Sequence, residues 1–257
     1  MVFLRGCPLR CPHCHNHALQ TGESNIELHA LASQIVCQTK GLQTAAMRLR
    51  ANPRQINLED ASIRASSRPF VDAFVISGGE PLQQPEACAR LLRLARSLGL
   101  VTGLETSGFY PDRLKRLLEK NIVDKIFLDL KTAIREPDYE MATGMKGVAA
   151  QVRKSLEICY QSAVPLDARS TIFPELPSLG QIKEIARVLE ELGREYPKSR
   201  LEHLVLQQGH PREGEPWFEP VSLERMQEMA RVVGENIPVK VRAPPVIKWV
   251  GETAKST

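Results

Sequence analysis

The sequence predicts an α/β fold in which a parallel sheet curves into a barrel-like layer, and two patterns along its 257 residues support this. Short runs rich in β-branched and aromatic residues alternate with longer stretches whose apolar residues recur at helical spacing. Unusual polar residues also follow nearly every expected strand. Because active sites of parallel α/β proteins form at the carboxyl ends of their strands, these residues predict one site at the top of a single sheet.

The strands are expected at 1–4, 71–76, 100–104, 125–130, 165–171 and 201–206, with a seventh short run at 238–242. The helices are expected at 27–48, 83–98, 111–120, 146–161, 178–193 and 221–234. Segment 49–69 breaks this rhythm with Pro53, Asn52 and several serines, and we interpret it as an insertion between the first helix and the second strand. The barrel is expected to take up 1–245, followed by a polar tail at 246–257.

The overall composition limits the function without naming it. The net charge of +4 suits an enzyme that binds anionic small molecules and does not call for nucleic acid. No apolar run approaches the roughly 18 residues that span a bilayer. Met1 to Leu4 are followed at once by Arg5, which is unlike a signal peptide. We therefore expect a cytoplasmic protein with no membrane partner.

Three of the six cysteines are crowded into the loop after the first strand, as Cys7, Cys11 and Cys14. Clustered cysteines in a cytosolic chain indicate metal or redox chemistry rather than disulfides. Cys88 and Cys159 fall on apolar helix stripes and are expected to be core residues, since a buried free cysteine behaves as a small hydrophobe. Cys37 lies off any clear stripe and receives no interpretation.

The cysteine loop reads Cys7-Pro-Leu-Arg-Cys11-Pro-His-Cys14. Thiolates are the usual protein ligands of iron–sulfur clusters, and three of them on a four-iron cube leave one iron open. An open coordination position is what a metal needs to bind a substrate or cofactor. The alternative is a structural zinc site that adds His13, His15 or His17 to the three thiolates.

Ser77-Gly78-Gly79-Glu80-Pro81 follows the second strand. Two glycines at a strand end allow close approach of the backbone to a ligand, and Glu80 could then accept a hydrogen bond from an ammonium group. A tight strand-to-helix turn with no ligand would use the same residues.

Two further charged groups lie on later strands. Asp129 and Lys131 share a face of the fourth strand, where they could form an ion pair or contact a ligand. Arg169 lies on a fifth strand that is otherwise apolar or hydroxylic, so it needs an anionic partner. A ligand carboxylate, Asp129 and Glu105 are the candidates.

Together these motifs resemble the radical S-adenosylmethionine (AdoMet) superfamily. The segments FLRGCPLRCPHCHN, VDAFVISGGEPLQQ, LETSGFYPDRLKRLLEKNIVDKIFLDLKT and DARSTIFP are similar to those of glycyl-radical-enzyme activating proteins. Within that group they resemble most the activating proteins of anaerobic ribonucleoside-triphosphate reductase. The resemblance covers most of residues 1–210.

This resemblance implies a partial, TIM-like (β/α)6 barrel with a [4Fe–4S] cluster on Cys7, Cys11 and Cys14. AdoMet would bind the fourth iron through its amino and carboxylate groups. The resemblance implies that Gly78, Gly79 and Glu80 contact the amino group of AdoMet and that Lys131 and Arg169 contact its carboxylate. Thr106, Ser107 and Asp129 would contact the ligand or a nearby cation. His13 would lie against the adenine.

The implied reaction is reductive cleavage of AdoMet to methionine and a 5′-deoxyadenosyl radical, with no general base and therefore no assigned catalytic residue. The radical would abstract a hydrogen from a glycine Cα of a glycyl-radical enzyme, the implied partner being anaerobic ribonucleotide reductase. A flavodoxin or ferredoxin would donate the electron. The alternatives are a radical AdoMet enzyme that modifies a small molecule, peptide or RNA, as 7-carboxy-7-deazaguanine synthase does, and a non-enzymatic metal-binding module.

Two features depart from the family pattern. Its usual Asp-Thr-Asn-Gly turn is Glu105-Thr106-Ser107-Gly108 here, which keeps the carboxylate but changes its reach. Segment 38–68 is unusually basic and is expected to be a solvated loop or, alternatively, a docking site for an acidic partner surface.

Overall fold

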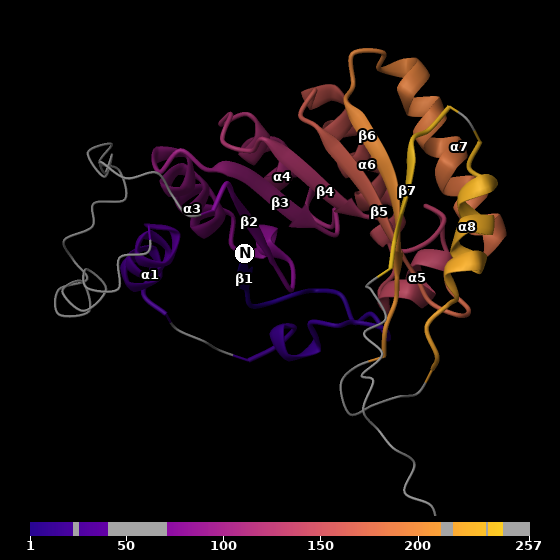
Figure 1. Ribbon diagram of the computed structural model, residues 1–257, viewed down its shortest axis with the longest axis horizontal. Coiled ribbons are helices and arrows are strands. Elements are labelled where there is room, and N and C mark those ends of the chain that lie inside the picture. Colours follow the sequence, from indigo (N-terminus) through magenta and orange to yellow (C-terminus); the bar gives the residue numbers. More distant parts are fainter. Residues whose placement is uncertain (23–25, 41–70, 212–217, 235, 244–257) are drawn as a thin grey trace, which may run out of the picture.

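In the computed structural model, seven parallel strands form one curved sheet whose order in space follows their order in the sequence, β1 to β7 (Figure 1). The structure describes residues 1–22, 26–40, 71–211, 218–234 and 236–243. The strands are β1 Val2–Leu4, β2 Ala73–Gly78, β3 Val101–Thr106, β4 Lys125–Asp129, β5 Leu166–Ile172, β6 Leu201–Gln208 and β7 Val239–Arg242. All seven predicted strands are therefore confirmed, with ends that shift by a few residues.

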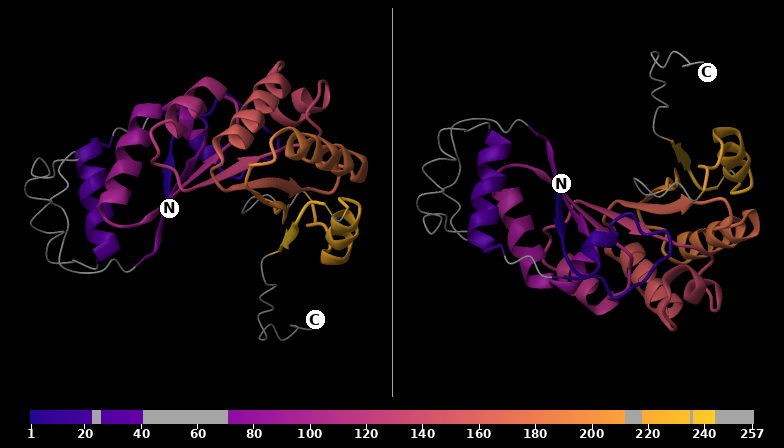
Figure 2. Two further views of the ribbon diagram at one scale, coloured as in Figure 1. Left: turned by 90° about the horizontal axis from the view of Figure 1, so that it is seen from above. Right: turned by 90° about the horizontal axis from the view of Figure 1, so that it is seen from below.

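Helices cover the outer side of the curved sheet and leave its inner side open (Figure 2). The α-helices are α1 Leu28–Lys40, α3 Pro85–Ser97, α4 Pro111–Leu118, α5 Asp138–Thr143, α6 Val148–Ser162, α7 Leu179–Glu195 and α8 Leu223–Arg231, and the short 3₁₀ helices are η1 His17–Leu19 and η4 Pro81–Gln83. The six predicted helices are confirmed where they are described. The short helix α5 was not predicted.

Local sequence signals explain where several helices begin. The Ser178 hydroxyl caps α7 by accepting a hydrogen bond from the backbone N–H of Gln181, and the Gln181 side-chain oxygen accepts one from the backbone N–H of Ser178. Ser222 caps α8 in a similar way. Pro85 and Pro111 start α3 and α4, where a missing N–H does no harm.

Strand alternation separates the core from the inner face of the sheet. On β5 the burial pattern alternates strictly, so Ala168 and Ser170 point to the helices while Arg169 and Thr171 point inward. The outward residues pack with the helix stripes into one hydrophobic core, which includes Cys88 and Cys159. Both cysteines are buried, as predicted.

The edges of the sheet, β1 and β7, are not paired with each other among the described strands, so the barrel is open on one side. This agrees with a partial TIM-like barrel. The predicted insertion at 49–69, most of the basic segment 38–68 and the predicted tail at 246–257 lie outside the described residues. No described helix combines the length and apolar character needed to cross a membrane.

Candidate active site

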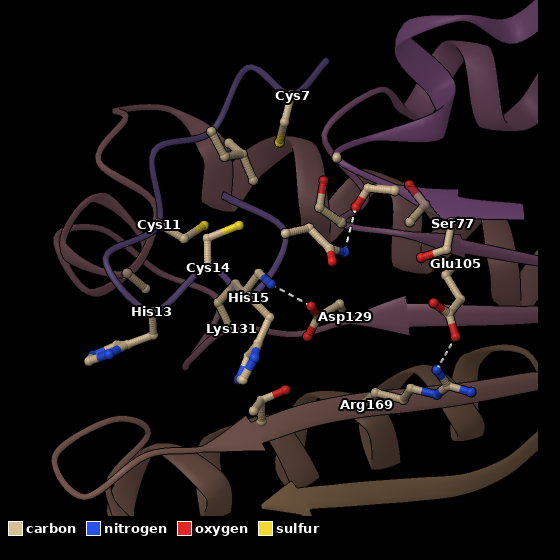
Figure 3. Close-up of a pocket in the computed structure, with 18 of the residues that line it drawn as sticks. Cys7, Cys11, His13, Cys14, His15, Ser77, Glu105, Asp129, Lys131 and Arg169 are labelled. Atoms are coloured by element: carbon tan, nitrogen blue, oxygen red, sulfur yellow. Dashed lines mark hydrogen bonds and ion pairs between the residues drawn. The ribbon is translucent and has the colours of Figure 1, made fainter. Parts of the chain in front are cut away.

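A cavity of about 270 Å³ lies at the carboxyl ends of the strands, between the sheet and the loop that follows β1. It brings together nearly all the predicted site residues (Figure 3). Those that line it are Cys7, Cys11, His13, Cys14, Gly78, Gly79, Thr106, Ser107, Asp129, Lys131 and Arg169. Glu80 is the single predicted residue that does not.

Backbone hydrogen bonds fasten the cysteine loop at both ends. The Gly6 amide donates to Leu19 O at 2.7 Å, and the Cys7 amide donates to Gln20 O at 3.2 Å. The Arg10 guanidinium donates to Cys7 O at 2.7 Å. The loop therefore holds its three thiols in fixed positions at one side of the cavity.

The three thiols fit a polynuclear cluster better than a single ion. They are half-buried and unbridged, and all three border the cavity. The three cysteine sulfurs do not all lie within 4.8 Å of one another, as the ligand atoms of a single metal ion would. Among the described residues, the one set of three potential metal ligands that is this compact consists of Asp167, Glu202 and His203. The cysteine sulfurs are therefore more widely spread than the ligands of one zinc ion would be.

The set at Asp167, Glu202 and His203 lies toward the amino ends of the strands and is not a vacant metal site. Lys125 forms ion pairs with Asp167, at 2.9 Å, and with Glu202. His203 Nδ1 lies 3.1 Å from the same Asp167 carboxylate. This cluster already carries its own cation.

Burial raises the pKa of the Cys7 thiol to about 11 and also raises the pKa of Cys11, with the Glu80 carboxylate adding to the effect at Cys7 and Asp129 at Cys11. Without a cation these thiols hold their protons at neutral pH. Iron would have to displace the protons on binding, as is general for thiolate metal sites.

The glycine turn after β2 is shaped by the cysteine loop. A Cβ on Gly78 would lie 2.1 Å from Leu4 O, and one on Gly79 would lie 2.4 Å from Gly6 O. The Asn16 side chain also donates to Gly78 O at 2.9 Å. The absence of side chains at Gly78 and Gly79 thus lets the backbone at Leu4 and Gly6 pack directly against this turn. A ligand in the cavity could also come close to it.

Glu80 lies behind the cavity wall rather than in it. Its buried carboxylate accepts hydrogen bonds from Thr106 Oγ1 at 2.8 Å, from the Ser107 amide at 2.8 Å, from Ser107 Oγ at 2.5 Å and from the Leu82 amide at 3.0 Å. Four donors already satisfy it, so it positions the Thr106–Ser107 turn. Its predicted contact with a ligand ammonium stays a prediction.

Asp129 and Lys131 form an ion pair at the end of β4, as the sequence allowed. Burial alone would lower the pKa of the Lys131 ammonium, but the nearby Asp129 and Cys11 outweigh burial and raise that pKa. The second carboxylate oxygen of Asp129, Oδ1, is buried and has no hydrogen-bond partner among the described residues. It remains available to a ligand donor.

Arg169 pairs with Glu105, one of the partners that the sequence proposed, at 2.5 Å. The guanidinium also lies over the ring of Phe127, 3.8 Å from its centre. Its Nε is buried and lacks a hydrogen-bond partner within the described part of the chain. The cavity thus offers a free acceptor on Asp129 and a free donor on Arg169, which suits a ligand with both an ammonium and a carboxylate group.

Aromatic rings close another side of the cavity. His13 stacks on Phe173, with ring centres 4.3 Å apart and planes at 19°. Phe218 meets both rings edge-on. Gly209 makes room for this stack, because a Cβ there would lie 2.5 Å from the Phe173 ring.

Several cavity residues were not assigned as cofactor or metal ligands from the sequence, although Thr171 and Gln207 are among the polar residues expected at strand ends. The unassigned residues are Asn16, Gln20, Phe127, Thr171, Phe173 and Gln207. Strand alternation could have found two of them, since Phe127 precedes Asp129 by two residues and Thr171 follows Arg169 by two. Gln207 follows the sixth expected strand and was one of the polar strand-end residues, whereas Phe173 carries no motif.

Several known proteins are similar to this chain in sequence. The isethionate sulfite-lyase activating enzyme of Nitratidesulfovibrio vulgaris is 25% identical over 281 residues, which cover 92% of this chain and 90% of that enzyme. The pyruvate formate-lyase-activating enzyme of Clostridium pasteurianum is 25% identical over 197 residues, covering 75% and 69% of the two chains. The pyruvate formate-lyase 2-activating enzyme of Escherichia coli is 29% identical over 142 residues, covering 51% and 47%.

A solved structure of TYW1 with a bound lysine–pyruvate adduct shares the fold. Its TM-score is 0.59 at 15% identity, and the match covers 92% of this chain and 71% of that one. In addition, the family model of the Radical SAM superfamily matches residues 1–178, which include the cysteine loop and the strand ends through Arg169. The chain therefore belongs to the radical SAM superfamily and is an enzyme of that type.

Proposed function

We propose that this enzyme activates a glycyl-radical enzyme, using AdoMet and a [4Fe–4S] cluster held by Cys7, Cys11 and Cys14. The single observation that carries the cofactor assignment is the cavity itself: three widely spaced thiols on one side face an unsatisfied Asp129 oxygen and an unsatisfied Arg169 nitrogen on the other. The relatives described above are each an activating enzyme, which supports the choice of reaction.

When bound, the cluster and AdoMet would supply a one-electron cleavage that yields methionine and a 5′-deoxyadenosyl radical, which takes a hydrogen atom from a glycine Cα. The residues of the chain bind and orient. Asp129 Oδ1 accepts from the ammonium group of AdoMet, and Arg169 donates to its carboxylate together with Lys131. Gly78, Gly79, Thr106 and Ser107 form the wall beside the methionine part.

His13 would lie against the adenine, with Phe173 stacked behind its ring. The aromatic rings and the cysteine loop also keep water from the reacting atoms, which a carbon radical requires. No proton needs to be moved, so no side chain is assigned as a general acid or base.

For the partner we propose anaerobic ribonucleotide reductase, because the motifs around the cysteines and β2 to β5 resemble those of its activating proteins most closely. A small low-potential carrier such as a flavodoxin or ferredoxin would supply the electron. We expect the reaction to take place in the cytoplasm, where the thiols stay reduced.

The test starts with anaerobic reconstitution of the whole chain with iron and sulfide. The proposal expects about four irons per chain, reductive formation of 5′-deoxyadenosine from AdoMet, and loss of both when any one of the three cysteines is replaced by alanine. The reconstituted enzyme is then mixed with anaerobic ribonucleotide reductase, and separately with pyruvate formate-lyase, and a glycyl radical is sought by electron paramagnetic resonance.

Each outcome decides a different part. A radical on pyruvate formate-lyase alone would keep the reaction and overturn the partner. Cleavage of AdoMet with no glycyl radical on either protein would favour a radical enzyme that modifies a small molecule, peptide or RNA. Tight zinc binding without AdoMet cleavage would favour a metal-binding module.

A further inference from the structure

Thr171 and Gln207 form a pair of neutral polar groups on the wall of the cavity. They are register partners on the adjacent strands β5 and β6, and both line the cavity. Both are half-buried, and within the described part of the chain neither side chain has a hydrogen-bond partner. Polar groups that face a cavity without internal partners are available to a ligand.

The strands hold this pair in place. Gln208, the next residue on β6, donates to Val221 O at 2.7 Å and so anchors the strand end to the segment before α8. Because neighbouring residues on a strand point to opposite faces, the Gln207 side chain is left on the cavity side. Thr171 follows Arg169 by two residues and shares its inward face.

The chemistry of the pair differs from that of the charged end of the cavity. Asp129 and Arg169 offer charged groups, which suit the ammonium and carboxylate of AdoMet. The glutamine amide instead offers a donor and an acceptor side by side, and the threonine hydroxyl offers either. A peptide unit presents the matching neutral N–H and C=O.

A glycine substrate makes such a pair useful. Glycine has no side chain, so an enzyme can orient its Cα only through the neighbouring main-chain amides and the flanking residues. Hydrogen transfer from that Cα to the 5′ carbon breaks one C–H bond and forms another, and it requires the two carbons to be held in contact. The wall that holds the target must face the cysteine loop, and Figure 3 shows Arg169, the inward neighbour of Thr171 on β5, across the cavity from Cys7.

We propose that Gln207 and Thr171 hydrogen-bond the main chain of the peptide segment that carries the target glycine and position its Cα for hydrogen abstraction. The inference rests on the proposed function and adds to it the two residues that would bind the peptide substrate. Both act as positioning residues.

The test uses the reconstituted full-length enzyme, AdoMet, dithionite and a synthetic peptide with the sequence of the glycine loop of anaerobic ribonucleotide reductase, in which the glycine is dideuterated. Mass spectrometry gives the fraction of 5′-deoxyadenosine that carries deuterium. Gln207→Met and Thr171→Val remove the polar groups at nearly constant volume. The matched controls are Thr171→Ser, which keeps the hydroxyl, and Gln161→Met on an exposed helix surface.

We expect the deuterated fraction to fall about tenfold in Gln207→Met and Thr171→Val, as the loss of one or two hydrogen bonds implies. Thr171→Ser and Gln161→Met should keep the wild-type fraction, and the dissociation constant of AdoMet should change by less than about twofold in all four. If the dissociation constant of AdoMet rose in Gln207→Met as the deuterated fraction fell, Gln207 and Thr171 would be assigned to the AdoMet ribose and the inference would be overturned. An unchanged deuterated fraction would also overturn it. A wild-type enzyme that cleaves AdoMet without deuterium transfer from this peptide would overturn anaerobic ribonucleotide reductase as the partner, and the same failure with the glycine-loop peptide of pyruvate formate-lyase would overturn the proposed reaction.

Discussion

Arg169 on β5 reaches past its register neighbour on β4 to pair with Glu105 on β3. Asp129 is that neighbour, but it already holds Lys131. The guanidinium therefore crosses β4 over the ring of Phe127, and its buried Nε has no hydrogen-bond partner among the described residues. A ligand carboxylate can bind this guanidinium while Glu105 still fixes it from the other side.

This arrangement predicts that Arg169→Gln weakens AdoMet binding about tenfold to a hundredfold. A hydrogen bond to a charged group contributes about 1.5–3 kcal/mol, and the substitution removes the charge that such a bond needs. Isothermal titration of the anaerobically reconstituted enzyme measures the affinity.

Because Arg169→Gln also leaves Glu105 unpaired, the double variant Glu105→Gln with Arg169→Gln serves as the control. It should bind AdoMet as weakly as the single variant while recovering stability. Wild-type affinity in both variants would remove Arg169 from the binding site.

Glu80→Ala is expected to lower the free energy of unfolding by about 3–5 kcal/mol, because it strands buried donors of Leu82, Thr106 and Ser107 that now bond one carboxylate. Urea denaturation of the metal-free protein measures this loss. Glu80→Gln keeps an acceptor oxygen and should lose less. An unchanged urea midpoint in Glu80→Ala would contradict the buried network.

The contrast between Glu80 and Arg169 shows what the sequence could predict. The order and direction of the strands follow from the spacing of apolar runs, and the strand-end residues gather because parallel strands end at one edge. The residues that pair with a given carboxylate cannot be predicted in the same way, because they come from distant parts of the sequence. Glu80 is predicted to contact a ligand, and the sequence does not show that its carboxylate also accepts hydrogen bonds from Thr106 and Ser107, which lie 26 and 27 residues further along.

Two other features could not be predicted for related reasons. Helix α5 has six residues and is too short for a periodic pattern to stand out. Phe173 and Phe218 meet His13 only because the strand ends and the segment before α8 converge on the cysteine loop. Such meetings depend on the curvature of the sheet, which no local pattern in the sequence encodes.

Cys88 and Cys159 are buried and are predicted to be alkylated much more slowly in the folded, iron-free protein at pH 8 than the half-buried Cys7, Cys11 and Cys14. Burial raises the pKa of Cys88 and of Cys159 to about 12, and only the thiolate is nucleophilic. Iodoacetamide labelling followed by peptide mass spectrometry gives the reactivity of each site. Rapid labelling of either buried cysteine under native conditions would contradict its place in the core.

The same raised values predict a pH effect on stability. The ordinary pKa of a free thiol is 9.0, so above this pH the unfolded chain releases thiol protons that the folded chain retains up to about pH 12. The stabilising contribution is complete below pH 9 and is lost as the pH rises toward 12. Urea midpoints between pH 8 and pH 10.5 should fall less steeply in Cys159→Ala than in the wild type.

Gly79→Ala is predicted to reduce the iron content of the reconstituted enzyme. Its new methyl group would lie 2.4 Å from Gly6 O and 3.1 Å from Cys7 Cβ, so the backbone of the cysteine loop must move. Backbone atoms cannot rotate away as a flexible side chain can, and overpacking of this kind costs about 1–3 kcal/mol. Iron analysis after anaerobic reconstitution, with urea denaturation alongside, measures both effects.

Gly193→Ala is the matched control, since a Cβ at this position in α7 meets nothing within 4 Å. Alanine is favoured over glycine inside a helix by about 0.5–1 kcal/mol, so this variant should gain stability and keep its iron. If Gly79→Ala bound iron as fully as Gly193→Ala and unfolded at the wild-type urea concentration, the glycine turn would not set the position of Cys7. The link between the turn after β2 and the cluster loop would then have to be abandoned.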